Sequence, residues 1–361
     1  MSLLAFGERL CAGAKARTLR GRLLEDAVYW QLLHCEDVGE IVDRLGTTPE
    51  YREVLEKVPR EIHRSELEEL LDHMLLRESG VFLGYLSGPR KAFLRAWVGL
   101  AEADGIKRAL RRLAAGRGEK DALRHRLEAL PYCSFSVEGL LAADRPEAVR
   151  EILRPTPYFH ALREPLRRFT EEGGGSLYGV EMALDGVALK RLYKSAQELP
   201  PGEREGVLSL AGALVDLTNV FWLYRGRFYF AQPPEEMLNR LLPVRHRVRI
   251  DLLRRLAGAG SGKDFWMELS DSPYRPAMDQ AFSEELFVDR GMEAFLFRQA
   301  TRLFAGGSPG FPMVVAYLFL RHYEVADLKT LVEDVRYGYT DRDAAVFLVR
   351  PILPGRGSVW R

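Results

Sequence analysis

The sequence predicts an all-α protein made of three similar helical-bundle domains, either strung out or closed around a pseudo-threefold axis. Leucines recur three and four residues apart with charged residues between them, as in residues 66–71, which is typical of amphipathic helices. No run alternates strictly between apolar and polar residues, so strands are not expected. Two short landmarks each occur three times, with a period the size of a small domain.

The first landmark is the dipeptide Leu-Pro, which recurs at nearly equal intervals along the chain. It occurs at Leu130-Pro131, Leu242-Pro243 and Leu353-Pro354. The second landmark reads Leu-x-x-(Thr/Ser)-Pro with a tyrosine close behind, and it occupies residues 45–51, 153–158 and 269–274. Together they predict three units, residues 1–131, 132–243 and 244–361, each large enough to bury its own core.

Each unit is expected to begin with a helix that leads into the second landmark. Proline disfavours helix in the residue before it, so the landmark proline should start the next helix. The preceding Thr48, Thr156 or Ser272 is expected to cap that helix. A long helix is then expected to begin near a glycine, at Gly80, Gly186 and Gly291.

An apolar helix in each unit ends in an acidic position, at Glu102, Asp216 and Glu324. A buried carboxylate can serve catalysis, so an enzyme that uses Asp216 is one interpretation. Because the acid recurs in all three units, we expect a structural role instead. The acids would face a basic partner helix or hold a hydrogen bond between helices.

Basic residues follow the acids in the first two units, and we predict that they contact an acidic partner. They are Lys107, Arg108, Arg111, Arg112, Arg225 and Arg227. A solvated helix face is the alternative. The aromatic residues around Arg225 could stack on RNA, but no strand pattern of an RNA-binding module accompanies them, so core packing is favoured.

Composition excludes several classes of function. The formal net charge is +1, so no overall field attracts nucleic acid or an anionic membrane. The three cysteines and seven histidines show no metal-ligand spacing, and residues 259–263 lack the pattern of a phosphate-binding loop. Residues 207–224 are apolar but carry Asp216, so no membrane span is expected. We predict no catalytic residue, no cofactor and no metal.

Several segments together resemble the C subunit of the prokaryotic V/A-type ATPases, the equivalent of the eukaryotic d subunit. They are the repeated Leu-x-x-Thr-Pro-Tyr unit, residues 215–219 followed by Arg225, and the stretch from Tyr317 to Leu328. The resemblance extends over nearly the whole chain and rests on the order and spacing of these segments. The chain departs from the pattern at Gly105, where the other units have Asn219 and Asp327.

This resemblance implies a funnel-shaped protein on the cytoplasmic face of the membrane rotor ring, peripheral to the membrane. The funnel would receive the lower end of the central stalk, made by the D and F subunits. It would couple ATP hydrolysis or synthesis to proton or sodium transport, with no active site of its own and no nucleic acid as partner. The alternative is a soluble all-helical scaffold unrelated to a rotary ATPase.

Overall fold

The computed structural model describes residues 3–116, 120–171, 177–277, 288–306, 310–337 and 345–352. These ranges are helical and contain no β-strand, which confirms the all-α prediction. The chain forms two compact units, one from residues 1–75 with 258–361 and the other from residues 76–257. The division into three repeats stays a prediction, and its third Leu-Pro landmark, Leu353-Pro354, lies outside the described residues.

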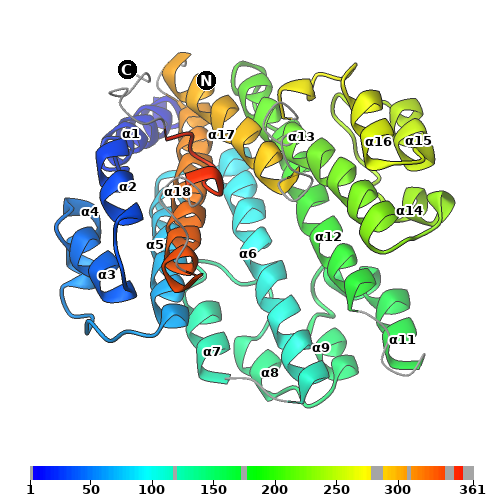
Figure 1. Cartoon of the computed structure of the whole chain (residues 1–361), viewed down its shortest axis with the longest axis horizontal. Helices are drawn as coiled ribbons and strands as arrows, with labels where there is room; N and C mark the ends of the chain where they lie inside the picture. Colours follow the sequence, from blue (N-terminus) through cyan, green and yellow to red (C-terminus); the bar gives the residue numbers. More distant parts are fainter. Residues whose placement is uncertain are drawn as a thin grey trace. The chain divides into compact units, whose positions relative to one another are not determined.

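The first compact unit combines the beginning and the end of the chain. Its helices are α1 (Leu3–Arg20), α2 (Asp26–Leu33), α3 (Val38–Gly46), α4 (Pro49–Leu55), the first half of α5 (Arg64–Tyr85), α16 (Gly262–Leu269), the short η2 (Arg275–Ala277), α17 (Val288–Gly306) and α18 (Phe311–Tyr337). Helices α17 and α18 lie side by side, and α1 packs along α18 (Figure 1). Helices α2 and α3 also contact α18.

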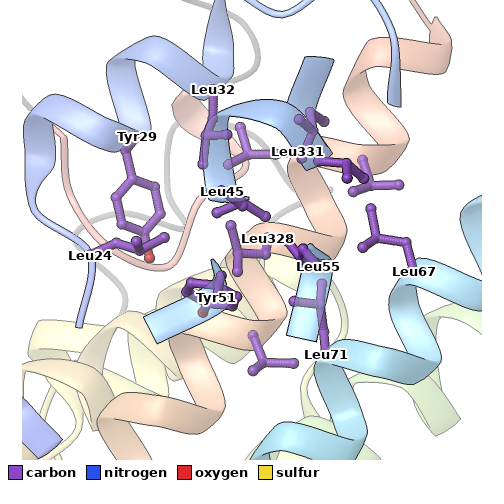
Figure 2. Packing of buried hydrophobic residues seen from close by; sticks show 14 of the residues in the cluster. Leu24, Tyr29, Leu32, Leu45, Tyr51, Leu55, Leu67, Leu71, Leu328 and Leu331 are labelled. Carbon is purple, nitrogen blue, oxygen red and sulfur yellow. The ribbon is translucent and has the colours of Figure 1, made fainter. Parts of the chain in front are cut away.

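Leucine and tyrosine side chains from both ends of the chain form the core of this unit (Figure 2). Leu45 and Tyr51 from the N-terminal helices pack in one cluster with Leu328 and Leu331 of α18, and all four are at most 1% exposed. Each fully buried side chain of this kind contributes about 1.5–3 kcal/mol. The apolar face of the N-terminal helices is therefore satisfied by the last long helix of the chain.

The second compact unit is built on three long helices, α6 (Gly88–Ala115), α12 (Tyr178–Gln197) and α13 (Pro201–Tyr224). Helix α12 packs against both α6 and α13 (Figure 1). The shorter elements are α7 (Lys120–Glu128), α8 (Val137–Ala142), α9 (Pro146–Ile152), α10 (Tyr158–Ala161), α11 (Arg163–Glu171), the π-helical η1 (Arg225–Tyr229), α14 (Pro234–Arg240) and α15 (Ile250–Gly258).

The expectation that a long helix begins near a glycine is confirmed at Gly291, in the first turn of α17, and is wrong at Gly80 and Gly186, which lie inside α5 and α12. Gly80 and Gly186 each lie beside a residue that is distant in the sequence. A Cβ atom on Gly80 would lie 3.0 Å from the Cβ of Pro131, and one on Gly186 would lie 3.5 Å from Leu242. Both neighbours belong to Leu-Pro landmarks. At Gly80 the short separation means that a glycine, which costs about 1 kcal/mol inside a helix, lets the landmark turn approach the helix backbone. The separation at Gly186 is an ordinary contact that alanine would also allow.

The second landmark starts a helix as predicted in the first repeat, where Pro49 is the first residue of α4. The expected cap differs between the repeats. Thr48 makes no capping hydrogen bond, whereas the hydroxyl oxygens of Thr156 and Ser272 accept from the N–H groups of Tyr158 at 3.3 Å and Tyr274 at 3.1 Å. The Thr48 hydroxyl donates to the Leu45 carbonyl at 2.7 Å, and the Thr156 hydroxyl donates to the Leu153 carbonyl at 2.7 Å. These hydroxyl groups therefore satisfy a carbonyl at the end of the preceding helix, where such groups lack helical partners.

Candidate functional site

Asp216 of α13 is fully buried, and both of its carboxylate oxygens accept backbone hydrogen bonds. Oδ1 accepts from the N–H of His246 at 2.8 Å. Oδ2 accepts from the N–H groups of Arg247 at 2.6 Å and Val248 at 2.9 Å. Hydrogen bonds to an ionised acceptor are roughly twice as strong as neutral ones. Asp216 therefore anchors the segment that leads into α15.

Asn219 lies one helical turn after Asp216 and anchors the neighbouring part of the same segment. Its Oδ1 accepts from the N–H of Leu242 at 2.8 Å, and its Nδ2 donates to the carbonyl of Val244 at 3.3 Å. Leu242 belongs to the second Leu-Pro landmark. The two polar residues of α13 thus fix the chain on both sides of Pro243.

Glu102 and Asp327 make the same kind of contact. Glu102 is fully buried and accepts from the N–H of Ser134, and burial raises its pKa. Asp327 accepts from the N–H of Val349 at 2.6 Å and from that of Arg350 at 3.1 Å. Burial raises the pKa of Asp327 to about 7, although both hydrogen bonds favour the charged form. All these acids bind backbone of their own chain.

Glu324 is part of a buried cluster that also includes side chains. Its Oε2 accepts from the N–H of Leu24 at 2.6 Å, and its Oε1 accepts from the Tyr51 hydroxyl at 2.7 Å. Arg321, which is fully buried, donates to the Tyr51 hydroxyl at 2.7 Å and pairs with Glu324. Burial and the neighbouring Glu324 carboxylate raise the pKa of Tyr51 well above its ordinary value.

The geometry of the acids favours the structural interpretation over the catalytic one. Asp216 and Glu102 have no exposed surface, and Glu324 is 3% exposed. A general acid or base must come within hydrogen-bond reach of a substrate. Closed off from solvent and bound to backbone amides, Asp216 has no such reach in this conformation.

Two of the predicted partner-binding residues connect α6 to α12. The Nζ of Lys107 lies 2.8 Å from Oδ1 of Asp185. Arg111 forms a two-pronged ion pair with Glu181, at 2.6 Å from Nε to Oε1 and 2.9 Å from Nη2 to Oε2. No local pattern predicts these pairs, because the acids follow the basic residues by 70 or more positions and only the packing of the two helices brings them together.

Arg108 and Arg112 also have partners within the second compact unit. The Nε of Arg108 lies 2.9 Å from Oδ2 of Asp104, one turn earlier on α6. Arg112 donates to the carbonyl of Ala143 at 3.2 Å. The four basic residues thus lie along α6, as their spacing predicts, and each has an intrachain partner. Arg108 and Arg111 remain about half exposed, at 49% and 52% of the side chain.

Arg225 and Arg227 lie in the π-helical turn that follows α13. Arg227 donates to the carbonyls of Ala257 at 2.8 Å and Gln232 at 2.7 Å, so it holds this turn against the end of α15. Arg225 is exposed, and its guanidinium lies 5.3 Å from the ring centre of Phe221. Among the residues that the structure describes, no carboxylate pairs with Arg225. Binding of a partner by the six basic residues stays a prediction.

A groove of about 710 Å³ in the second compact unit was not predicted from the sequence. Helices α11, α12 and α14 line it, with Phe169 and Trp222 among its apolar side chains. The ring of Tyr178 lies 4.7 Å from that of Phe230 at this groove. The lining is of mixed charge, with Lys190 and Arg240 beside Glu164 and Glu236.

The sequence stretch that approaches a phosphate-binding loop is the start of a helix. Ser261 caps α16, and its Oγ accepts from the N–H of Asp264 at 3.1 Å. Over the described ranges, no group of three or more His, Cys, Asp or Glu side chains is arranged to hold a metal ion.

One helix in the described part of the chain, residues 201–229, is long and apolar enough to cross a membrane by length and composition. The core helix of a soluble protein passes the same test, and 67% of its most apolar window is buried inside the protein. It also carries Asp216 in its buried part. The segment is therefore accounted for by its role in the helical core.

The described part of the chain is an all-helical protein whose recurring buried acids bind its own backbone, an arrangement typical of a structural subunit. The chain belongs to the ATP synthase (C/AC39) subunit family, which it matches over residues 12–344. It is similar to the C subunit of the A-type ATP synthase of Methanothermobacter thermautotrophicus, with 23% identity over 330 residues that cover 90% of this chain and 83% of that protein. The family resemblance predicted from the sequence is confirmed.

Proposed function

We propose that this protein is the non-catalytic socket of the central stalk in a rotary V/A-type ATPase. It joins the D and F stalk subunits to the proteolipid ring of the membrane rotor. In this position it transmits rotation and so couples ATP hydrolysis or synthesis to proton or sodium transport. The observation that carries the proposal is membership of the ATP synthase (C/AC39) subunit family over residues 12–344.

The internal contacts of the second compact unit suit a subunit that transmits torque. Its long helices are tied to each other and to their connections by buried polar groups, such as Asp216 with three backbone amides. Arg90 of α6 and Glu203 of α13 add a buried two-pronged ion pair at 2.8 and 3.0 Å. Such anchors resist sliding of one helix past another, because any displacement leaves a buried polar group unpaired.

In the proposed complex the three predicted repeats surround a pseudo-threefold axis and form a funnel. The protein is peripheral to the membrane on its cytoplasmic face, and the ring supplies the attachment. The burial of its most apolar helix agrees with that position, since this helix already has a place in the protein core. Many distributed contacts with the stalk suit a socket better than one central contact.

The basic residues of α6 and of the turn after α13 are the proposed stalk contacts. Arg108, Arg111 and Arg225 are the most accessible of the six. Arg108 and Arg111 pair with intrachain acids but keep about half of each side chain exposed, so acids of a partner can reach them. Charge complementarity of this kind mainly sets the docking rate and the register.

Affinity purification of the tagged protein from detergent-solubilised membranes of its source organism tests the function. We expect co-purification of the ATPase catalytic subunits, the D and F stalk subunits and a small proteolipid. Recovery of soluble partners alone would reject the socket and support the alternative of a soluble helical scaffold.

A variant with Lys107, Arg108, Arg111 and Arg112 replaced by alanine tests the proposed contacts. We expect weaker binding to the purified D and F subunits and an unchanged helical content by circular dichroism. The matched control replaces four other basic residues of the same compact unit with alanine: Arg154, Arg163, Arg167 and Arg168. Equal binding by the variant and the control at physiological salt would count against the assignment of α6.

A further inference from the structure

The buried acids of the first two repeats bind a segment at a nearly constant position relative to the landmark proline that follows. Glu102 binds the N–H of Ser134, which lies some two dozen positions before Pro157. Asp216 binds the N–H groups of residues 246–248, which lie at a similar distance before Pro273. In both cases the acid of one repeat holds the beginning of the next repeat.

The acid of the third repeat follows the same rule, but the segment that it binds belongs to the first repeat. Glu324 binds the N–H of Leu24, which stands at the same kind of distance before Pro49, the landmark proline of the first repeat. Leu24 and Glu324 are 300 positions apart. The N-terminal segment, defined here as residues 24–55, therefore occupies on α18 the place that the beginning of a fourth repeat would take.

The landmark tyrosines repeat this relation independently. The hydroxyl of Tyr158 in the second repeat donates to the carbonyl of Gly99 on α6 at 3.1 Å, one helical turn before Glu102. The hydroxyl of Tyr51 in the first repeat donates to Glu324 on α18 at 2.7 Å. Each tyrosine thus reaches the acid-bearing helix of the repeat before it, and for the first repeat that helix belongs to the third.

The apolar clusters agree with the polar contacts. In one cluster, Ile106 and Leu110 of α6 pack with Val149 and Leu153 at the second landmark. In the other, Leu328 and Leu331 of α18 pack with Ile41 and Leu45 at the first landmark (Figure 2). The same helix face is covered by the same part of a repeat in both.

We propose that the N-terminal segment and α18 form a clasp, a non-covalent joint equivalent to the two joints that the continuous chain makes at Ser134 and at residues 246–248. Closing a loop of about 300 residues costs more conformational entropy than closing one of about 30. The clasp contains additional polar contacts that offset this cost. Its occupant is the N-terminal segment of the same chain.

The additional contacts involve Arg321 and Arg350. Arg321 donates to Tyr51 at 2.7 Å and pairs with Glu324. Arg350 donates to the carbonyl of Leu24 at 2.7 Å and to Asp26 at 2.8 Å. The backbone N–H of Arg350 is itself bound by Asp327, so this arginine connects α18 to the beginning of the N-terminal segment.

Amide hydrogen exchange of the full-length protein, read by mass spectrometry, tests the clasp. In a Glu324→Gln, Arg350→Ala variant we expect exchange in residues 24–55 to accelerate at least tenfold, while residues 90–115 stay as protected as in the wild type. The matched control is Asp216→Asn in a continuous joint, which should accelerate exchange around residues 246–258 and leave residues 24–55 unchanged. Unchanged protection of residues 24–55 in the clasp variant, or an equal loss everywhere, would overturn the proposal.

Wild-type protein provides a second measurement that does not depend on the folding of a variant. In increasing urea below global unfolding, residues 24–55 should lose protection at a lower concentration than residues 90–115. Opening of both at the same concentration argues against a separate joint. A native wild-type dimer in which residues 24–55 cover α18 of a second copy would also overturn the proposal, because the clasp is intramolecular.

Discussion

Replacing Gly212 with alanine tests how rigidly Asp216 holds its segment. A Cβ atom on Gly212 would lie 2.3, 2.6 and 2.8 Å from the Cγ, Cδ2 and Cβ atoms of His246. Rotation of the histidine side chain can remove the first two contacts. It cannot move the Cβ of His246, whose position is set by a backbone that donates to Asp216 at 2.8 Å.

The expected cost follows from these distances. Relief of the Cβ contact requires a backbone shift of roughly half an ångström or more, which weakens a hydrogen bond to a carboxylate that is worth roughly 1.5–3 kcal/mol in full. Overpacking adds about 1–3 kcal/mol. The change from glycine to alanine inside a helix returns about 1 kcal/mol. We expect Gly212→Ala to lower the free energy of unfolding by about 3 kcal/mol.

Urea unfolding followed by tryptophan fluorescence and circular dichroism measures this change. Gly202→Ala on the same helix is the control, because a Cβ atom there meets no atom within 4 Å. A second replacement separates the two parts of the clash. His246→Gly should rescue Gly212→Ala, whereas His246→Ala should rescue it only slightly, because alanine keeps the Cβ atom.

The reasoning is refuted if Gly212→Ala is as stable as Gly202→Ala. That result would mean that the segment at His246 shifts freely, and that its hydrogen bond to Asp216 contributes little.

Three further predictions concern other buried polar groups. Arg90→Met should cost about 3–5 kcal/mol of stability by leaving Glu203 buried and unpaired, and adding Glu203→Leu should recover most of it, as urea unfolding would show. Asp216→Asn should cost about 3 kcal/mol in the same assay, because an amide has one acceptor oxygen for three backbone donors. With a pKa of about 7 when folded, against 3.8 ordinarily, Asp327 holds a proton that the unfolded chain releases. Its contribution to stability should therefore decline as pH rises from about 4 to 7, by up to about 1.4 kcal/mol per pH unit. The difference in stability between wild type and Asp327→Asn, measured from pH 4.5 to 8.5, should follow that decline and level off above pH 7.

Each of these predictions has an outcome that contradicts it. If the double variant at Arg90 and Glu203 proves no more stable than Arg90→Met alone, the stability lost in Arg90→Met does not come from the unpaired charge of Glu203. Wild-type stability for Asp216→Asn would remove the case for an anchor. A difference between wild type and Asp327→Asn that stays constant with pH would show that Asp327 titrates in its ordinary range.

The helical class and the helix start at the first landmark could be predicted from the sequence, because both depend on local patterns. Leucine spacing marks the buried face of a helix, and Pro49 starts α4 as its fixed backbone angle requires. The tripled acids correctly indicated a structural role, since groups such as Asp216 and Asn219 hold hydrogen bonds between α13 and the following segment.

The errors have two causes, tertiary packing in one case and a competing local hydrogen bond in the other. The sequence predicts a helix start near Gly80, but this glycine lies inside α5, where Pro131, far along the chain, comes close to it. The hydroxyl of Thr48 satisfies the Leu45 carbonyl rather than capping the next helix. The approach of Pro131 could not be assigned before the packing was known, whereas the bond from Thr48 to Leu45 is a local alternative that competes with the cap.

The predicted basic residues were found where their helical spacing places them, but their partners were not foreseen. Asp185 and Glu181 pair with Lys107 and Arg111 only because α12 packs against α6. Nothing in the sequence near Leu24 indicates Glu324 as its partner either. Only the period of the repeats, continued past the end of the chain, leads to that pair.

The location of α18 at the end of the chain has a consequence for synthesis on the ribosome. The apolar face of residues 24–55 has no complete cover until residues 311–337 have been made. The N-terminal part of the first compact unit ends at residue 75. At about 5–20 residues per second, translation from there to residue 337, the end of α18, takes roughly 15–50 seconds. During that interval the nascent chain exposes Leu32, Ile41 and Leu45. This protein should therefore depend on chaperones that shield its beginning until its end emerges.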